Sequence, residues 1–297
     1  MNKILFVINP ISGGRDKTGL HQEIYSFCKN NHLQGEIMET TGKNDFDRIH
    51  KKMEQVAPDT VVACGGDGTI NMVAQALLKK SITLGIIPLG SANGLAAELL
   101  IPRDIKKALD IIKENNVLPI DIVQINGKYI SLHLSDVGFN AKLIKHFDQG
   151  RVRGKLGYLT HFFKTLHKKS PRRYTFNLKG NKFRRRAEMV VFANASRYGT
   201  GAVVNPEGII NDGKFEVCIF KPYPWYAIFR LTFDFFTGRM KKSPYVKIFS
   251  TTEITVKAHK AVPLQIDGEV IGDFKTVYVK MLQKQLPVIV SPYFKIT

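Results

Sequence analysis

Small and polar residues gather in three short segments in the first third of the chain, and each segment follows an apolar run. The central segment is Gly65-Gly66-Asp67-Gly68-Thr69, and the other two are Asn9-Pro10-Ile11-Ser12-Gly13 and Gly90-Ser91-Ala92-Asn93. Glycines let backbone N–H groups approach a bulky phosphate with no Cβ in the way, and the start of a following helix attracts an anion. Any one of these segments can be a turn, but three of them predict a polar, phosphate-binding crevice.

Asp67 is the unusual residue of the central segment, because a carboxylate repels a bare phosphate. It suits such a site only if Mg²⁺, or a water held by a metal, lies between the two. The alternative is a tight strand-to-helix turn in which Asp67 caps the helix. The segment is neither a Walker loop, which ends in GK[ST], nor the GxGxxG dinucleotide pattern.

A second group of candidate residues lies near the end of the chain, in LQIDGEVIG at 264–272. Asp267 and Glu269 follow an apolar run, and in continuous strand geometry both side chains would point to one face. Such a pair could provide a general base, with an acidic neighbour, that deprotonates a substrate hydroxyl. The alternative is an Asp-Gly hairpin turn with Glu269 as a solvated residue at the strand edge.

The elements that must position these residues alternate over the first 120 residues. Short apolar runs alternate with helical patterns, at 3–8, 18–31, 60–64, 70–80, 82–88, 94–100 and 104–115. This alternation predicts an α/β domain with a parallel sheet covered on both faces, over residues 1–120. Because ligands of such sheets bind beyond the carboxyl ends of the strands, the three polar segments would share one rim.

After about residue 120 the pattern changes to short strands separated by Gly, Asn and Pro turns. This pattern predicts a β-rich second domain over residues 121–285, interrupted by a helical insertion near 154–169. The last segment, 286–297, could return to the first domain.

The chain is strongly basic, with 44 Lys and Arg against 25 Asp and Glu and a net charge of +19. Fifteen of the cations lie in residues 142–186, where Asp148 is the single acid, so this segment carries +14. Aromatic and leucine side chains are interleaved with them, for example Tyr158, Phe162 and Phe163. Rings at headgroup depth among cations are typical of a surface that binds an anionic membrane.

Other composition features limit the class of protein. Cys28, Cys64 and Cys218 lie far apart without CxxC spacing, which argues against a disulfide framework or a zinc site and favours a reducing compartment. The first apolar run is too short for a secretory core, and no stretch reaches the roughly 18 uncharged apolar residues of a membrane span. We therefore expect a cytoplasmic protein that lies peripherally on the inner membrane face.

Taken in order, NPxSG, GGDGT, a G[TS]xN loop, a basic β-rich region and DGE resemble the diacylglycerol kinase catalytic-domain family of lipid kinases. GGDGT alone also occurs in NAD kinases and phosphofructokinase-like folds, so the ordered set carries the specificity. The resemblance implies an NAD kinase/diacylglycerol kinase-like fold with ATP in the interdomain cleft. It also implies an ATP- and Mg²⁺-dependent kinase whose acceptor is a hydroxyl of a membrane lipid such as diacylglycerol.

The resemblance also implies roles for single residues. Glu269 matches the proton acceptor, with Asp267 beside it, and Asp67 and Asp121 match acids of the active-site network. Asp212, with the carbonyls of Ile209 and Lys214, matches a loop that binds a structural Mg²⁺, although an Asn-Asp-Gly turn explains Asp212 as well. The positions that match ATP-binding residues are Asn9, Pro10, Ile11, Ser12, Gly13, Thr40, Gly65, Gly66, Asp67, Gly68, Thr69, Ile70, Asn71, Ser91 and Asn93.

Two departures from the family pattern remove acids: Gly94 follows Asn93 where Asp is usual, and Asn140 stands where Asp is common. Two other functions remain open. One is a kinase of a soluble substrate such as NAD, and the other is a non-catalytic basic module that binds a membrane or nucleic acid. Because no nucleic-acid motif is visible, we expect no nucleic-acid partner. A homodimer is compatible with the sequence.

Overall fold

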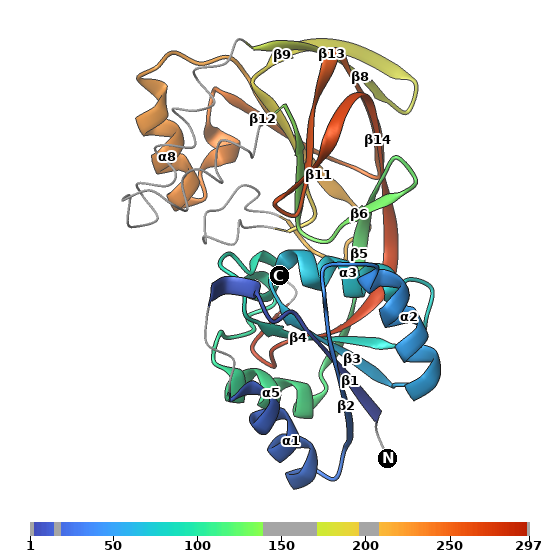
Figure 1. Cartoon of the computed structure of the whole chain (residues 1–297). Helices are drawn as coiled ribbons and strands as arrows, with labels where there is room; N and C mark the ends of the chain where they lie inside the picture. Colours follow the sequence, from blue (N-terminus) through green and yellow to red (C-terminus); the bar gives the residue numbers. More distant parts are fainter. Residues whose placement is uncertain (1–2, 15–18, 139–170, 196–207, 296–297) are drawn as a thin grey trace. The chain divides into compact units, whose positions relative to one another are not determined.

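A computed structural model of the 297-residue chain describes residues 3–14, 19–138, 171–195 and 208–295. The chain forms two compact units (Figure 1). Unit 1 consists of residues 1–120 and 284–297, and unit 2 consists of residues 121–283. The helical insertion expected near 154–169 lies outside the described residues.

Unit 1 is built on a parallel sheet with strand order β14-β4-β3-β1-β2. The strands are β1 (Lys3–Ile8), β2 (Gln34–Glu39), β3 (Thr60–Gly65), β4 (Thr83–Pro88) and the end of β14 (Glu269–Ile289). β1, β3 and β4 are almost entirely buried, as expected for apolar strands in a sheet covered on both faces. In the register, Ile8 lies beside Cys64 and Gly65 lies beside Pro88, so these three strands end at one edge.

Helices cover both faces of this sheet. α1 contacts α5 and α2 contacts α3, and Figure 1 shows the two pairs on opposite sides. Each helix buries a stripe of apolar residues at helical spacing, for example Leu20, Ile24 and Phe27 in α1. Their bounds are α1 (Leu20–Asn30), α2 (Asp45–Val56), α3 (Asp67–Leu77), the short α4 (Gly94–Glu98) and α5 (Ile105–Glu114).

The sequence pattern missed β2 and α2 and placed the start of α3 three residues late. β2 is a polar strand at the edge of the sheet, so it lacks the apolar run that marks β1, β3 and β4. α3 begins at Asp67, within the glycine-rich segment that reads as a turn. The polar segment is therefore partly the first turn of a helix.

Unit 2 is β-rich, as expected. Its strands are β5 (Val117–Ile125), β6 (Tyr129–Ser131), β7 (Leu134–Val137), β8 (Arg172–Leu178), β9 (Asn181–Ala187), β10 (Met189–Ala193), β11 (Phe215–Phe220), β12 (Val246–Thr251), β13 (Glu253–Ile266) and β14. One apolar cluster joins residues from β8, β10, β11, β13 and β14, including Phe176, Phe192 and Leu264. A second cluster lies on the other side of β10 and β11, where α8 (Ala227–Thr237) covers Val191, Cys218 and Phe220. β13 is one long strand rather than two short ones, with a register shift between Lys257 and Val262.

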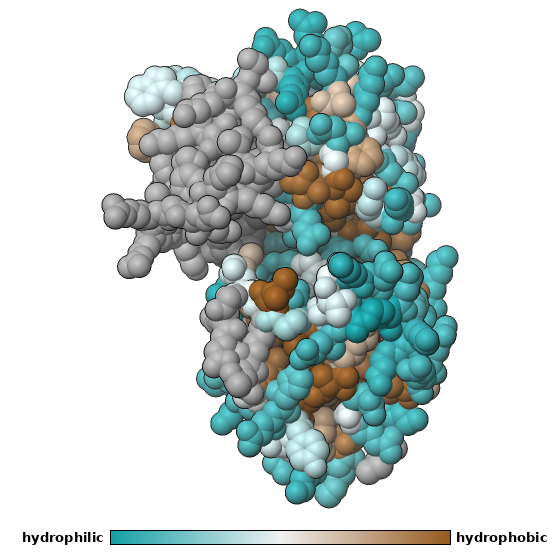
Figure 2. Space-filling view, in the orientation of Figure 1, coloured by the Kyte–Doolittle hydropathy of each residue, from teal (hydrophilic) through white to brown (hydrophobic). Residues whose placement is uncertain are grey.

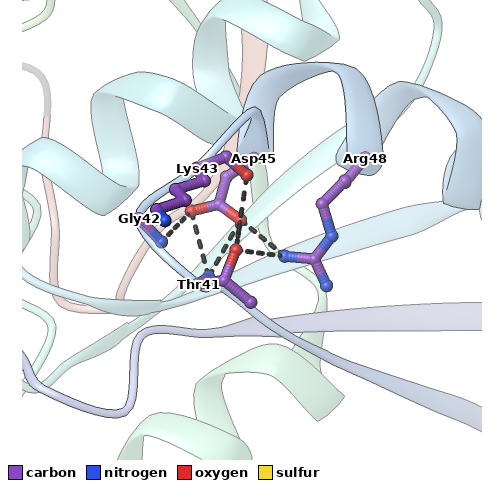
Figure 3. A network of polar contacts seen from close by, with 5 residues as sticks. All are labelled: Thr41, Gly42, Lys43, Asp45 and Arg48. Carbon is purple, nitrogen blue, oxygen red and sulfur yellow. Dashed lines mark hydrogen bonds and ion pairs between the residues drawn. The ribbon is translucent and has the colours of Figure 1, made fainter.

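The loop between β2 and α2 is organised by one buried carboxylate, that of Asp45 (Figure 3). The backbone N–H groups of Thr41 and Gly42 donate to it, at 2.9 and 2.6 Å, and Arg48 Nη1 lies 2.6 Å from Oδ1. Burial acts to raise the pKa of this carboxyl, but the hydrogen bonds and the guanidinium outweigh burial and hold the pKa below its ordinary value.

We expect Asp45→Asn to lower the free energy of unfolding of unit 1 by about 1–2 kcal/mol at pH 7, since it removes a charged acceptor from the backbone N–H groups of Thr41 and Gly42. A carboxyl with a lowered pKa contributes stability above its unfolded pKa and loses it as the pH falls through the folded pKa. The difference between the two proteins should therefore shrink below about pH 4. Urea unfolding tests this, with the exposed Asp47→Asn as control; equal losses in both variants would contradict it.

Candidate functional site

The three polar segments of unit 1 meet at the carboxyl edge of its sheet. Asn9 Nδ2 donates to Thr69 Oγ1 at 3.1 Å, which joins the first segment to the second. A Cβ added at Gly66 would lie 3.2 Å from Gly90 Cα, so the second segment touches the third. Gly13 has φ +65°, and a Cβ there would collide with the Leu89 carbonyl oxygen. The expected common rim is therefore present, and its glycines are the residues that let the backbones approach.

Side-chain hydrogen bonds hold each segment in shape. Asn9 Oδ1 accepts from Ile11 N at 3.1 Å, and Ser12 Oγ donates to the Asn9 carbonyl at 3.0 Å. Asn93, buried and in the left-handed region, accepts from Gly90 N at 2.8 Å and donates to Gly90 O at 2.7 Å. These contacts fix the loops without a ligand.

The start of α3 offers an anion-binding end. Its N-cap residue is Gly66, which has no side chain with which to cap the helix. Asp67 is the first residue of α3, and its Oδ1 accepts from Leu95 N at 3.4 Å, at the start of α4. Backbone N–H groups in the first turn of a helix have no partner inside the helix and attract phosphate oxygens. The start of α3 is therefore a candidate phosphate-binding site.

The remaining ATP-site candidates lie at or beside this rim in different environments. Thr40 follows β2, is buried, and donates its backbone N–H to the Ile8 carbonyl at 2.8 Å. Ile70 is fully buried in the core, whereas Pro10 and Ser91 are exposed and Gly68 is half-buried. Asn71 accepts from Gln75 at 2.8 Å. Ile11 is 86% exposed, so an apolar side chain projects from the rim into solvent.

The Asp267 and Glu269 pair lies in unit 2, at the hairpin between β13 and β14. Asp267 and Gly268 have φ of +45° and +92°, and Ile266 pairs with Glu269 across them. The Asp-Gly hairpin interpretation is therefore confirmed. Strand geometry does not continue through these residues. The expectation that Asp267 and Glu269 point to one face assumed a continuous strand, so it has no basis.

The Asp267 carboxylate holds the segment that joins β6 to β7. It accepts from Ser131 Oγ at 2.9 Å and from the backbone N–H groups of Leu132, His133 and Leu134 at 3.0–3.1 Å. Glu269 is exposed, and the structure gives its carboxylate no partner among the described residues. One acid is thus used in positioning the hairpin and the other faces solvent, where it can accept a proton.

Asp121 is fully buried at the start of unit 2 and tied to the loop that contains Asp212. Its carboxylate accepts from Gly213 N, and its own N–H donates to the Ile210 carbonyl at 2.9 Å. Asp212 is exposed, and its Oδ1 accepts from Lys214 N at 2.9 Å, so the Asn-Asp-Gly segment is a turn.

This turn is the Mg²⁺ site that the sequence predicts. It offers one exposed carboxylate and the main-chain carbonyls of Ile209 and Lys214, which are oxygen ligands of the kind Mg²⁺ accepts while keeping several waters. Among the described residues no group of three His, Cys, Asp or Glu side chains could hold a metal. The donor set fits one magnesium ion with a largely aqueous shell and does not fit a multi-carboxylate site.

Two family models together cover most of the chain. The diacylglycerol kinase catalytic domain matches residues 3–125, and the YegS C-terminal NAD kinase beta sandwich-like domain matches residues 135–290. The chain belongs to the diacylglycerol kinase catalytic-domain family of lipid kinases.

Relatives and solved structures agree with this assignment. A probable lipid kinase YegS-like from Enterobacter sp. (strain 638) is 29% identical over 223 residues, 73% of each chain. Another from Klebsiella pneumoniae (strain 342) is 31% identical over 206 residues, 67% of this chain and 68% of the relative. A diacylglycerol kinase structure from Bacillus anthracis has the same fold, with a TM-score of 0.79 at 20% identity over 98% of each chain.

As a member of this lipid kinase family, the chain is a phosphotransferase with an alcohol acceptor, so the non-catalytic interpretation is wrong. Gly94, the departure from the family's GTxND pattern, is buried at the first position of α4. Asn140, the other departure, lies outside the described residues.

Sequence reasoning missed Asn194 and His133 of this lipid kinase. Asn194 is 1% exposed, and its Nδ2 donates to the carbonyls of Asp121 at 2.8 Å and Leu132 at 3.0 Å. It therefore links Asp121 to the segment that Asp267 holds. Asn194 Oδ1 and His133 Nε2 are buried and have no hydrogen-bond partner among the described residues, which is unusual for buried polar atoms. The only sequence signal was a polar residue at the end of the apolar run MVVFANA.

The lipid kinase also buries an acid that its sequence did not single out, Glu188, between β9 and β10. Within the part of the chain that the structure describes, its Oε2 has no hydrogen-bond partner. Burial raises the pKa of its carboxyl to about 7, partly opposed by the positive charge of Arg186.

We expect Glu188→Gln to remove a pH dependence of stability. A carboxyl with a raised pKa contributes stability below its unfolded pKa and loses it as the pH rises through the folded value, here between about 4.5 and 7. At pH 8 the variant should be more stable than the wild type by about 1–2 kcal/mol, with little difference at pH 4.5. Urea unfolding at both pH values decides this, and an unchanged pH dependence in the variant would refute it.

Proposed function

We propose that this chain is an ATP- and Mg²⁺-dependent lipid kinase that transfers the γ-phosphate to a hydroxyl of a membrane lipid, with diacylglycerol as the first candidate. The observation that carries the proposal is the meeting of three glycine-containing loops around the start of α3. The named relatives are lipid kinases, which favours a lipid over a soluble acceptor.

The donor site in this proposal is the rim of unit 1. The N–H groups of Asp67, Gly68 and Thr69 would bind phosphate oxygens at the positive end of α3. Asn9, fixed to Thr69, would place the first loop over the same phosphates. Such contacts hold the nucleotide and neutralise charge, which is most of what phosphoryl transfer requires from a protein.

The acceptor chemistry in this proposal belongs to unit 2. Glu269 takes the proton of the acceptor hydroxyl. At the same time the hydroxyl oxygen bonds to the γ-phosphorus, and the bond between the γ-phosphorus and the ADP oxygen breaks. Asp267 fixes the hairpin that carries Glu269 through its four hydrogen bonds. Asn194 and Asp121 support the same segment from the other side. A structural Mg²⁺ would be held by Asp212 and the carbonyls of Ile209 and Lys214, where it would supply positive charge that fixes this loop of unit 2.

An exposed aromatic surface on unit 2 supports a lipid substrate. Trp225, Tyr226, Phe229 and Phe233 lie on or just before α8 and are 55–65% exposed, beside Arg230 and Arg239. In Figure 2 pale and light-brown side chains project where α8 lies, at the upper left. Amphipathic rings beside cations suit the boundary between headgroups and acyl chains. No helix of the described residues is long and apolar enough to cross a membrane.

The basic segment 142–186 belongs to the same proposal. Residues 142–170 lie outside the described residues, and the remainder forms β8 and β9. We propose that these cations hold the enzyme on an anionic bilayer, peripherally and on the cytoplasmic side. Exposed charges are screened by salt, so membrane binding should weaken as ionic strength rises.

The experiment that tests this function is transfer of labelled γ-phosphate from ATP and Mg²⁺ to a panel of acceptors. The panel contains diacylglycerol, a sphingoid base, ceramide and phosphatidylglycerol in anionic mixed micelles, with NAD as a soluble acceptor. NAD is included because the second half of the chain matches an NAD kinase beta sandwich-like model. Label in one lipid supports the proposal, and label in NAD alone would overturn it.

A further inference from the structure

A groove of about 980 Å³ lies on the outer face of strands β8, β9, β13 and β14, and none of the candidate-site residues named above lines it. Of the residues that the structure describes, no acid lines this groove. Its lining is cationic and hydroxyl-rich: seven Lys or Arg side chains, one His, three Thr and one Asn surround it, together with Tyr174 and Ala258. The seven are Arg173, Lys182, Arg184, Arg185, Arg186, Lys257 and Lys275.

The strand register explains why five of these cations share a face, namely Arg173, Lys182, Arg184, Arg186 and Lys257. Arg185, which alternates with Arg184 and Arg186, lies over the Phe183 ring. Arg184 of β9 pairs with Thr175 of β8, which pairs with Lys257 of β13, which pairs with Thr276 of β14. The next residue of each strand, such as Phe176 or Val256, points to the apolar cluster on the inner face. Because side chains alternate between faces, the basic residues two apart along β9 all point outward. Figure 2 shows hydrophilic side chains over β8 and β9.

Like charges lie directly opposite each other in this sheet. Arg173 pairs with Arg186 across β8 and β9, an arrangement that destabilises a sheet. Within the described residues, none of the seven cations forms an ion pair with a carboxylate. The groove therefore has an unbalanced positive charge on a rigid sheet, and an anion that entered it would relieve the repulsion.

The chemistry of the lining favours phosphate. Guanidinium groups bind phosphate oxygens through paired N–H donors, and the hydroxyls of Thr175, Thr255 and Thr276 add neutral donors. A single-stranded nucleic acid also needs several exposed rings on which successive bases stack, and the rings in the lining are the buried Tyr174 and the single exposed imidazole of His259. Charge complementarity without a stacking platform favours the headgroups of an anionic bilayer over nucleic acid.

We propose that this groove binds the phosphate headgroup of an anionic phospholipid. This inference rests on the proposed function, since it places the enzyme at a bilayer, but it concerns a different lipid from the acceptor. Diacylglycerol has no charge that seven cations would recognise, so the lipid in the groove is a phosphate-bearing component of the membrane. The groove anchors unit 2 to the surface in which the neutral acceptor is dissolved.

The test is binding to phosphatidylcholine vesicles with and without phosphatidylglycerol, measured by co-sedimentation in the absence of ATP. The double variant Arg184→Gln/Lys257→Gln should bind the anionic vesicles roughly 30-fold more weakly than the wild type, from about 1 kcal/mol per cation. The control is Lys128→Gln/Lys280→Gln, which removes the same charge from exposed positions of unit 2 outside the groove. The control should bind within about twofold of the wild type. Its two lysines lie outside the groove, and the proposal assigns headgroup binding to the groove and not to the total charge.

Two outcomes would overturn the proposal: equal losses in both double variants, or tighter binding to a single-stranded oligonucleotide than to anionic vesicles. Phosphate transfer to acceptors in neutral detergent micelles is measured separately on the same proteins. Vesicle binding that depends on the groove, without lipid phosphorylation, would refute the kinase proposal and leave the groove assignment intact. Lipid phosphorylation by a protein whose vesicle binding does not depend on the groove would refute the groove assignment and leave the kinase proposal intact.

Discussion

Glu269→Gln should lower the rate of phosphate transfer by roughly 10²- to 10⁴-fold while leaving ATP affinity unchanged, because a general base contributes about that much to a reaction. The substitution keeps the size of the side chain and removes its ability to accept a proton. Glu269 is exposed and has no partner among the described residues, so the fold does not depend on its charge. The measurement is kcat for lipid phosphorylation together with the dissociation constant for ATP.

The matched control is Asp273→Asn, since Asp273 is another exposed acid of β14, four residues along the same strand. It should leave kcat within about twofold, as surface substitutions away from a site usually do. A Glu269→Gln protein that is folded, binds ATP and transfers phosphate at the wild-type rate would show that another group, or water, takes the proton.

Gly13→Ala should lower kcat/KM for ATP by about 10²-fold, the cost of misplacing a bound group by about an ångström. Gly13 has φ +65°, and the added Cβ would collide with the Leu89 carbonyl oxygen, which is backbone and cannot turn aside. The first loop must therefore move away from the third. The contact of Asn9 with Thr69 would be disturbed with it, because Asn9 lies in the same loop.

Gly42→Ala separates this effect from backbone strain. Gly42 has φ +78°, in the same unit and the same left-handed region, but a Cβ there would meet nothing within 4 Å. Both variants therefore carry a similar conformational cost, and only Gly13→Ala pushes the loops apart. Equal kcat/KM values for the two variants would mean that the meeting of the loops has no part in ATP binding.

The sequence predicted that the three polar loops of unit 1 meet at one edge of the sheet, for a physical reason. β1, β3 and β4 are apolar runs of six residues, and the rule that parallel strands end at one edge places the loops after them together. β2 was missed because an edge strand can be polar, and its residues from Gln34 to Glu36 are exposed. The strands β1, β3 and β4 have residues buried on both faces of the sheet, and the register of unit 1 follows from the pairing of these strands.

The contacts of the candidate residues in unit 2 were harder to predict, because these contacts join residues far apart along the chain. Asp267 binds the segment around Ser131–Leu134, and Asn194 binds Asp121 and Leu132. Local patterns cannot show such pairs. The dipeptide Asp-Gly indicated both a turn and a catalytic acid, and the positive φ of Asp267 with its four accepted hydrogen bonds shows how the turn uses that carboxylate. The sequence did not single out the outward face of β9, because the cations of this strand lie within the longer basic segment 142–186.

A single-turnover experiment tests the central claim most directly. Excess enzyme, labelled ATP, Mg²⁺ and diacylglycerol in anionic micelles are mixed and quenched, and the label in lipid and in free phosphate is counted for wild type and Glu269→Gln. The account predicts that the wild type places one γ-phosphate in lipid per ATP bound, and that the variant binds the same ATP without transferring it. Lipid labelled equally fast by both proteins, or label released only as free phosphate by the wild type, would contradict it.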